Sequence, residues 1–305
     1  MLQKKLTSRT AWLSQYQCSH IYSLLMADSS KLSAPTTLVE TLVDDHLVRI
    51  IAYPPSILNE PRLFTGQKLL HPFQLKQVSV QNTWSKDTSK VRTEPTYDEN
   101  FLSEGIDKEI QTAYHFEIKV DGQGGIIVID ENGVPKAYTK YDVKRNESGE
   151  FKKPPPNSIP GEPKPTDPAA THWPHYVPLE SDPKMYKFNL IASELAKKSG
   201  KLDSVKQTFT CEYMGKKFNS KKSDPIDSDG VIVPHGLLQI EIPTELRTYN
   251  GFLQIFQAIP YIEGIIVHGE TNVWKIRRDM FCVNGEKLKW PTIYSFALSA
   301  VVALV

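Results

Sequence analysis

HFEIKVDGQGGIIVID, residues 115–130, is the stretch from which the rest of the sequence is best approached. Residues 115–120 and 126–129 are β-prone, and DGQGG at 121–125 favours a tight turn between them. We therefore predict a strand, a turn and a second strand. Lys119 stands beside the turn and is a candidate nucleophile, because the glycines would let a ligand approach. The alternative is an ordinary hairpin whose lysine points into water.

The composition predicts a β-rich, loop-rich protein. The 305 residues suffice for one large domain or two small ones, and they are 40% hydrophobic with 22 prolines. A net charge of +1 gives no overall basicity, so any nucleic-acid site would be a local patch. The three cysteines, Cys18, Cys211 and Cys282, show neither metal-ligand nor disulfide spacing, which fits a reducing compartment.

The two ends of the chain differ from its middle. Residues 1–27 carry Lys4, Lys5 and Arg9 and no acid before Asp28, which weakly resembles organelle targeting. The alternative is a disordered or poorly packed leader on a cytoplasmic protein. Residues 292–305 are uncharged, but a membrane span needs about 20 apolar residues. We expect a buried last strand or helix there, and no membrane association.

Periodicity and turn residues predict mostly strands, at 78–80, 134–139, 207–214, 231–233, 237–242, 261–268 and 272–277. Capping signals predict helices over 183–199 and over 250–258, the second capped by Asn250. Residues 36–53 show helix-like and then strand-like periodicity, and polar residues 85–108 predict a loop. This order is not an alternating βαβ pattern, and no glycine-rich phosphate loop is present.

The segment 152–178 is dense in proline, which predicts a long surface loop or a polyproline-type interaction segment without sheet pairing. Trp173, His175 and Tyr176 at its end would either stack on bases or pack the loop down. Lysines 136, 140 and 144 with Arg145 form a local basic cluster before it. The plain interpretation of that cluster is a solvated strand edge.

Four short elements follow one another along the chain: Lys119-Val-Asp121-Gly122, Glu212, Glu263-Gly264 and Lys275-Ile-Arg277. Each alone is most often a solvated strand residue or, for Asp121, a turn residue. Lys275 and Arg277 are two apart in a predicted strand and so face the same side.

In this order the elements resemble the covalent nucleotidyltransferases, which are the ATP-dependent DNA and RNA ligases and the mRNA-capping guanylyltransferases. The segments EIKVDG, VPHGLLQIEIP, EGIIVHG and VWKIRRDMF are similar to the vertebrate-type auto-adenylylating 5′–3′ RNA ligase family, over residues 70–291. Two departures stand out. Ile118 occupies a position where a polar residue is common, and Arg277 replaces the second lysine of the closing motif.

The resemblance implies an α+β fold, an antiparallel β-rich adenylylation domain of two sheets with flanking helices. It divides the chain into an N-terminal extension (1–60), the ligase domain (61–291) and an apolar tail (292–305). It further implies a monomeric RNA ligase that uses ATP and Mg²⁺ (or Mn²⁺). Such an enzyme joins 5′-phosphate and 3′-hydroxyl RNA ends through lysine–AMP and an adenylylated RNA 5′ end.

The same resemblance implies the site residues. Lys119, Lys275 and Glu263 would be catalytic, and Glu263 and Asp121 would hold the metal. The expected nucleotide ligands are Glu117, Lys119, Asp121, Gly122, Lys140, Arg145, Glu212 (on the ribose), Lys275 and Arg277. His235 is expected to be a turn or packing residue. It is not expected to be a catalyst.

Other functions remain open. A capping guanylyltransferase or a DNA ligase usually brings a C-terminal OB domain of at least about 50 residues. Only 28 residues follow Arg277. A non-catalytic RNA-binding module on the same fold is the third possibility.

Overall fold

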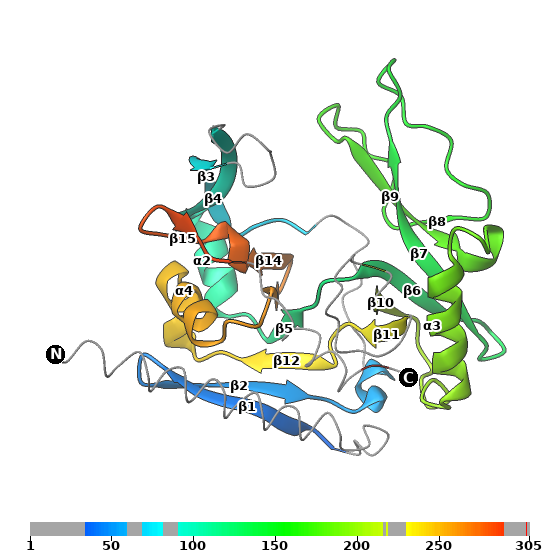
Figure 1. Cartoon of the computed structure of the whole chain (residues 1–305), viewed down its shortest axis with the longest axis horizontal. Coiled ribbons are helices and arrows are strands. Elements are labelled where there is room, and N and C mark those ends of the chain that lie inside the picture. The colour runs from blue at the N-terminus through cyan, green and yellow to red at the C-terminus, as the bar shows by residue number, and fades with distance from the viewer. Residues whose placement is uncertain are drawn as a thin grey trace.

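The computed structural model describes residues 34–59, 69–81, 91–215, 218, 230–289 and 303. Two six-stranded sheets form the body of this part of the chain, and their named strands pair antiparallel (Figure 1). Two separate two-stranded ribbons and three α-helices accompany them. The β-rich α+β class expected from the sequence is confirmed.

The first sheet has the order β1-β2-β12-β5-β13-β14. Its strands are β1 (Thr36–Val43), β2 (His46–Ala52), β12 (Leu238–Glu241), β5 (His115–Lys119), β13 (Gly264–His268) and β14 (Val273–Arg277). The strands predicted at 261–268 and 272–277 are confirmed as β13 and β14, which pair with each other as a hairpin. Strand β5 lies in the interior of this sheet, between β12 and β13.

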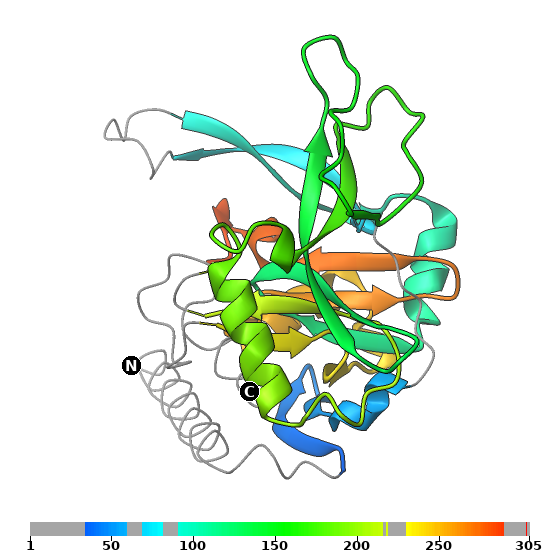
Figure 2. The ribbon, with the colours of Figure 1, turned by 90° about the vertical axis from the view of Figure 1, so that its right-hand side faces the viewer.

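The second sheet has the order β11-β10-β6-β7-β9-β8. Its strands are β11 (Val231–Pro234), β10 (Phe209–Met214), β6 (Gln123–Ile129), β7 (Pro135–Lys144), β9 (His172–Pro178) and β8 (Ile159–Pro160). Helix α3 (Lys187–Lys198) packs against this sheet at β11 (Figure 2). The predicted strands at 134–139, 207–214 and 231–233 are confirmed.

The expected hairpin at 115–129 is wrong. Both strands exist, but β5 belongs to the first sheet and β6 to the second. The chain crosses between the sheets at residues 120–122, and it crosses back between β11 and β12 at residues 235–237. On β5 Phe116, Glu117 and Ile118 are buried, and on β6 Ile126 and Ile127 are buried. Neighbouring residues of a strand face opposite sides, so both strands are covered on two faces. Two consecutive strands that are buried on both faces have the same apolar pattern whether they pair with each other or belong to different sheets. The sequence pattern therefore does not distinguish the two arrangements.

Residues 36–52 form a hairpin, so the helix-like interpretation of the first part of 36–53 is wrong and the strand-like interpretation of its later part is confirmed. Asp44 and Asp45 join β1 to β2 with φ of 48° and 64°, the left-handed pair that a two-residue hairpin turn requires. Strand β2 pairs directly with β12. These residues, which the division at residue 60 assigned to an extension, are therefore part of the first sheet.

Two predicted loops also contain regular structure. Strand β4 (Val91–Phe101) pairs with β3 (Phe73–Gln81), and α2 (Glu104–Gln111) follows it, where a loop was predicted over 85–108. In the proline-rich segment, β9 pairs along β7 in spite of Pro174 and Pro178. The opposite edge of β9 pairs with β8 at two positions only. Prolines are tolerated there because most of this edge has no partner strand that would accept a backbone N–H.

The remaining elements are short. Helix α4 (Tyr249–Ala258) confirms the prediction at 250–258, but its N-cap is Thr248, whose Oγ1 accepts a hydrogen bond from the Gly251 amide at 3.1 Å. Strands β15 (Cys282–Val283) and β16 (Glu286–Lys287) pair with each other. Single 3₁₀ turns occur at Pro55–Asn59, Leu179–Ser181, Thr244–Leu246 and Arg278–Met280.

An aromatic cluster joins the ribbon of β3 and β4 to α4 and to Phe281, which stands just before β15. Phe73 and Tyr97 from β3 and β4 pack with Phe252, Phe256 and Phe281, and all five are fully buried. No helix among the described residues is long and apolar enough to cross a membrane. The segments 1–27 and 292–305 lie outside the described residues, apart from Ala303, which is buried.

Candidate functional site

A cavity of about 260 Å³ lies where the chain crosses between the two sheets. Glu117, Lys119 and His268 line it from the first sheet, and Lys140, Tyr176 and Glu212 line it from the second. His235, at the return crossing, lines it too. The sheet-to-sheet crossings thus bring predicted site residues from β5, β7 and β10 into one place.

The strand register arranges the basic residues of the first sheet. Lys119 on β5 pairs with Gly264 on β13, which pairs in turn with Arg277 on β14. Two residues further along β13, Ile266 pairs with both Glu117 and Lys275. Directly paired residues share a face, as do residues two apart, so Glu117, Lys119, Lys275 and Arg277 lie on one face of the sheet.

Lys275 and Arg277 are not among the residues that line the cavity. The Arg277 guanidinium donates through Nη2 to Asp279 Oδ2 at 2.7 Å. The backbone of β14 is held by Tyr97, whose hydroxyl donates to the Lys275 carbonyl at 3.3 Å and accepts from the Arg277 amide at 3.0 Å. The two cations are therefore positioned by a rigid strand next to the cavity.

Lys119 forms an ion pair with Glu263 through Nζ and Oε1. The Lys119 side chain is 26% exposed and that of Glu263 only 2%. Glu263 was expected within a strand but lies one residue before β13, where its carbonyl accepts from the Arg278 amide. A Cβ on the neighbouring Gly264 would lie 3.4 Å from Lys119 Cδ and 2.6 Å from the Ile276 oxygen, so glycine leaves the path of the lysine open.

The charges around Lys119 set its protonation state. Burial by itself would favour the neutral amine, but Glu263, Glu212 and Asp121 outweigh it and raise the pKa of Lys119. Burial raises the pKa of Glu263, which Lys119 opposes. These carboxylates keep Lys119 as an ammonium ion, and it would have to lose a proton before acting as a nucleophile.

Two carboxylate oxygens near Lys119 are candidate metal ligands. Glu263 Oε2 and Glu212 Oε2 are buried and accept no hydrogen bond from any described residue. A buried anionic oxygen without a donor is costly, and hard cations such as Mg²⁺ bind such oxygens. Asp121 is close enough to influence both Lys119 and Glu263 electrostatically. The donor set therefore fits a magnesium ion held by Glu263, with Asp121 or Glu212.

The wall of the cavity opposite Lys119 is formed by the second sheet. Glu212 Oε1 lies 3.5 Å from His235 Nε2, so the histidine contacts a site residue and is not only a turn residue. A Cβ on Gly122 would lie 2.7 Å from the Tyr213 oxygen, so this glycine lets the crossing segment approach β10. Gly124 instead has ordinary contacts, at 3.6 Å to the Lys140 side chain. Gly122 thus has a packing role and does not line the cavity.

Arg145 is occupied elsewhere. Its guanidinium donates to the carbonyl oxygens of Ala170 at 2.7 Å, Gly149 at 2.5 Å and Asp167 at 3.0 Å. It also stacks on Phe151 at 4.1 Å. These contacts hold the loops around β8 together, and Arg145 does not line the cavity, so the phosphate contact expected for it has no support in this geometry.

The aromatic residues that end the proline-rich segment mainly pack it down. Trp173 Nε1 donates to the Glu162 carbonyl at 3.0 Å, and His175 is 2% exposed. Tyr176 is also buried but lines the cavity. Of the three residues considered for base stacking, only Tyr176 is placed to meet a ligand in this cavity.

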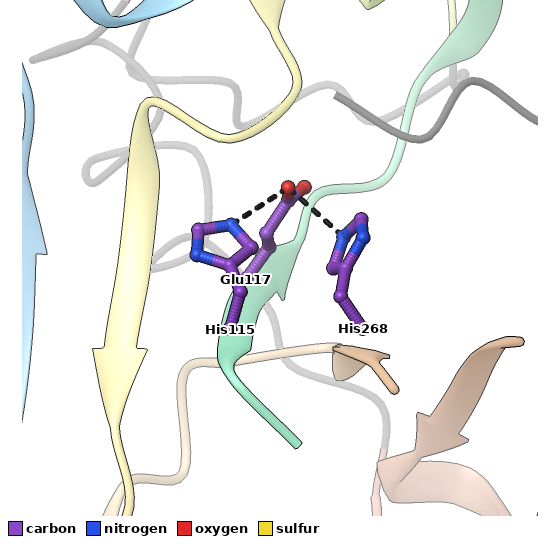
Figure 3. A group of neighbouring side chains, drawn as sticks. All are labelled: His115, Glu117 and His268. Atoms are coloured by element: carbon purple, nitrogen blue, oxygen red, sulfur yellow. Dashed lines mark hydrogen bonds and ion pairs between the residues drawn. The ribbon is translucent and has the colours of Figure 1, made fainter. Parts of the chain in front are cut away.

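Two histidines beside Glu117 were missed by the sequence reasoning. His115 Nε2 lies 2.9 Å from Glu117 Oε1, and His268 Nε2 lies 3.0 Å from the same oxygen (Figure 3). His115 could have been noticed because it stands two residues before Glu117 on the same strand. His268 could not, because only the pairing of β13 with β5 brings it there.

No family model, curated protein or solved structure matches the chain. The function must therefore be argued from the residues of the cavity themselves.

Proposed function

We propose that the protein is an ATP-dependent RNA ligase that becomes adenylylated on Lys119. The observation that supports this most is the position of the Lys119 amine. It lies at the wall of a cavity between two sheets, paired to the buried Glu263 and facing Glu212 and Lys140 from the other sheet. This set of groups suits the transfer of a nucleotide to an amine.

In the first proposed step, Lys119 Nζ attacks the α-phosphorus of ATP. A nitrogen–phosphorus bond forms, the bond to the bridging oxygen breaks, and pyrophosphate leaves. The attacking amine must be neutral. For an ordinary lysine of pKa about 10.4, deprotonation at pH 7 costs about 4–5 kcal/mol. The carboxylates around Lys119 increase that cost, because they raise its pKa further.

Cations near Lys119 would lower this cost. When bound by Glu263 and Asp121, Mg²⁺ would supply positive charge that disfavours the ammonium and offsets the charge of the phosphates. Lys275 and Arg277 share the sheet face of Lys119 and would do the same from β14. The ion pair with Glu263 would be exchanged for the metal as the nucleotide enters.

The nucleotide would lie between the two sheets. Glu212 would accept hydrogen bonds from the ribose hydroxyls, and Lys140 would contact the phosphates from the second sheet. Glu117 lies two residues from Lys119 on the same face, and so about 7 Å along the strand. It would contact the nucleotide at a point remote from the reacting phosphate.

Two further steps would complete ligation. An RNA 5′-phosphate oxygen attacks the phosphorus of lysine–AMP, the nitrogen–phosphorus bond breaks, and Lys119 recovers its amine. The 3′-hydroxyl of a second RNA end then attacks the 5′-phosphate, and AMP leaves. Mg²⁺ at the same carboxylates would offset the charge of the leaving groups in these steps also.

A labelling experiment tests the first step. We expect the full chain to acquire label from α-³²P-ATP with Mg²⁺, and we expect Lys119→Ala and Lys119→Arg to acquire none. Lys136→Ala is the matched control, because Lys136 is an exposed lysine on β7 that forms an ion pair with Asp130. Normal labelling of Lys119→Ala would contradict the proposal, as would an absence of label on the folded wild-type chain.

The same assay separates the alternatives. Excess unlabelled ATP should remove the label and GTP should not. The opposite result would favour a capping-type guanylyltransferase. Chase of the labelled protein with 5′-phosphorylated RNA or DNA should transfer AMP to RNA only. RNA binding without any label would favour a non-catalytic binding module.

A further inference from the structure

We propose that His115, Glu117 and His268 form a binding site for a late first-row divalent metal ion such as Zn²⁺. The three side chains come together beside the cavity, which Glu117 and His268 line (Figure 3). Two imidazoles and one carboxylate are a known ligand set for zinc in sites that keep one position open. The inference rests on these residues alone and does not depend on adenylylation of Lys119.

The backbone fixes the cluster. His115 and His268 are directly paired across β5 and β13, and Glu117 is two residues beyond His115 on β5. All three therefore project from the same face of the sheet. Both strands are interior strands, each paired on two sides. Ligands on such strands are held more exactly than ligands on loops.

The ligand atoms converge at metal-binding distances. One ligand atom from each of the three residues lies within 4.8 Å of the other two, and both Nε2 atoms are 2.9–3.0 Å from Glu117 Oε1. In a tetrahedral site with bonds of about 2.0–2.1 Å, ligand atoms lie about 3.3 Å apart, so a small rotation of the rings would suffice. In the described structure His268 Nε2 is buried and makes no aligned hydrogen bond, although it is 3.0 Å from Glu117 Oε1.

The chemistry of the ligands selects the metal. Imidazole nitrogen suits Zn²⁺, Ni²⁺ and Cu²⁺, whereas Mg²⁺ prefers oxygen. The site is therefore distinct in kind from the carboxylate set of Glu263 and Glu212. Because Glu117 and His268 line the cavity, the open coordination position would face it. A metal here would engage Glu117 and so compete with a nucleotide that uses this residue.

Titration of the metal-free full chain with Zn²⁺ alone, followed by calorimetry, tests the proposal. We expect one equivalent to bind to the wild type. His115→Gln and His268→Gln should each weaken that binding by about tenfold or more. His172→Gln is the matched control, because His172 is exposed and its Nδ1 lies 2.7 Å from the hydroxyl oxygen of the adjacent Thr171, which is also exposed. Lys119→Ala should bind Zn²⁺ like the wild type. This result is expected whether or not the wild type becomes labelled with AMP.

A second measurement covers variants that fold poorly. Co²⁺ added to the wild type should give the visible absorption of a four- or five-coordinate nitrogen–oxygen site, and Zn²⁺ should abolish it. Zn²⁺ should also raise the melting temperature of the wild type. Absence of Zn²⁺ binding to the folded wild type would overturn the proposal and leave a hydrogen-bonded cluster. So would equal affinity in the wild type and the two histidine variants.

Discussion

Lys119 lies directly opposite Gly264 across β5 and β13, and its ammonium group reaches beyond that glycine to the carboxylate of Glu263. The glycine and the glutamate are consecutive in the sequence, but they contribute in different ways. Gly264 leaves space for the lysine side chain, and Glu263 supplies the charge that holds it. Glu263 and Gly264 thus act together to position the Lys119 amine at the cavity.

Gly264→Ala should damage both the fold and the site. The new Cβ would lie 2.6 Å from the backbone oxygen of Ile276 and 3.4 Å from Lys119 Cδ. We expect a loss of about 1–3 kcal/mol in the free energy of unfolding, measured by urea denaturation, and weaker labelling of Lys119. Gly105→Ala on α2 is the control, because no atom lies within 4 Å of its new Cβ, and it should be neutral or slightly stabilising. Equal stability of the two variants would contradict this account.

Glu263→Gln should lower the pKa of Lys119. The carboxylate is the strongest of the groups that raise this pKa, while burial, which lowers it, would remain. The rate at which an amine-reactive probe modifies Lys119 rises with pH as the amine loses its proton. Its midpoint should therefore shift to lower pH in Glu263→Gln, measured without nucleotide by mass spectrometry of the Lys119 peptide. An unchanged midpoint would show that Glu263 does not control this proton.

Lys140→Ala and Arg145→Ala should separate ligand binding from loop packing. Lys140 lines the cavity, so its variant should weaken ATP-dependent labelling and leave the unfolding curve nearly unchanged. Arg145 holds three loop carbonyls, so its loss should cost about 1.5–3 kcal/mol of stability and leave labelling of the folded fraction intact. If Arg145→Ala is as stable as the wild type but loses labelling, the result would support the phosphate contact that the sequence resemblance implied for Arg145.

Glu117 should make the folded state sensitive to acid. Burial tends to raise its pKa, but the close contacts of its carboxylate with His115 and His268 lower it well below the ordinary 4.5. The unfolded chain thus takes up this proton at a higher pH than the folded chain. The stability that the ionised group contributes is present above about pH 4.5 and is lost as the pH falls below it. Unfolding free energies of Glu117→Gln between pH 6 and pH 3 should fall less steeply than those of the wild type, and parallel curves would contradict this.

Local patterns sufficed for many elements. Alternation and turn residues located β10, β13 and β14, and the helix predicted over 183–199 contains α3, which begins only at Lys187. They failed where pairing partners come from distant segments. Polar β4 is a strand because β3 pairs along it, and β9 tolerates prolines because its outer edge is largely unpaired. Neither fact is contained in the local sequence.

The candidate site divides in the same way. The sequence by itself supplied the order of motifs that singled out Lys119, Glu212, Glu263 and Lys275 through a family resemblance, and of these Lys119 and Glu212 line the cavity. Only the tertiary structure decided that β5 and β6 belong to different sheets, so that the turn after Lys119 is a crossing with a cavity beside it. The tertiary structure also decided that His268 lies next to Glu117 and that Arg145 binds loop carbonyls away from the cavity. The physical reason is that a strand's periodicity fixes its own two faces, whereas the long-range pairing of β5 with β12 and β13 fixes what those faces meet.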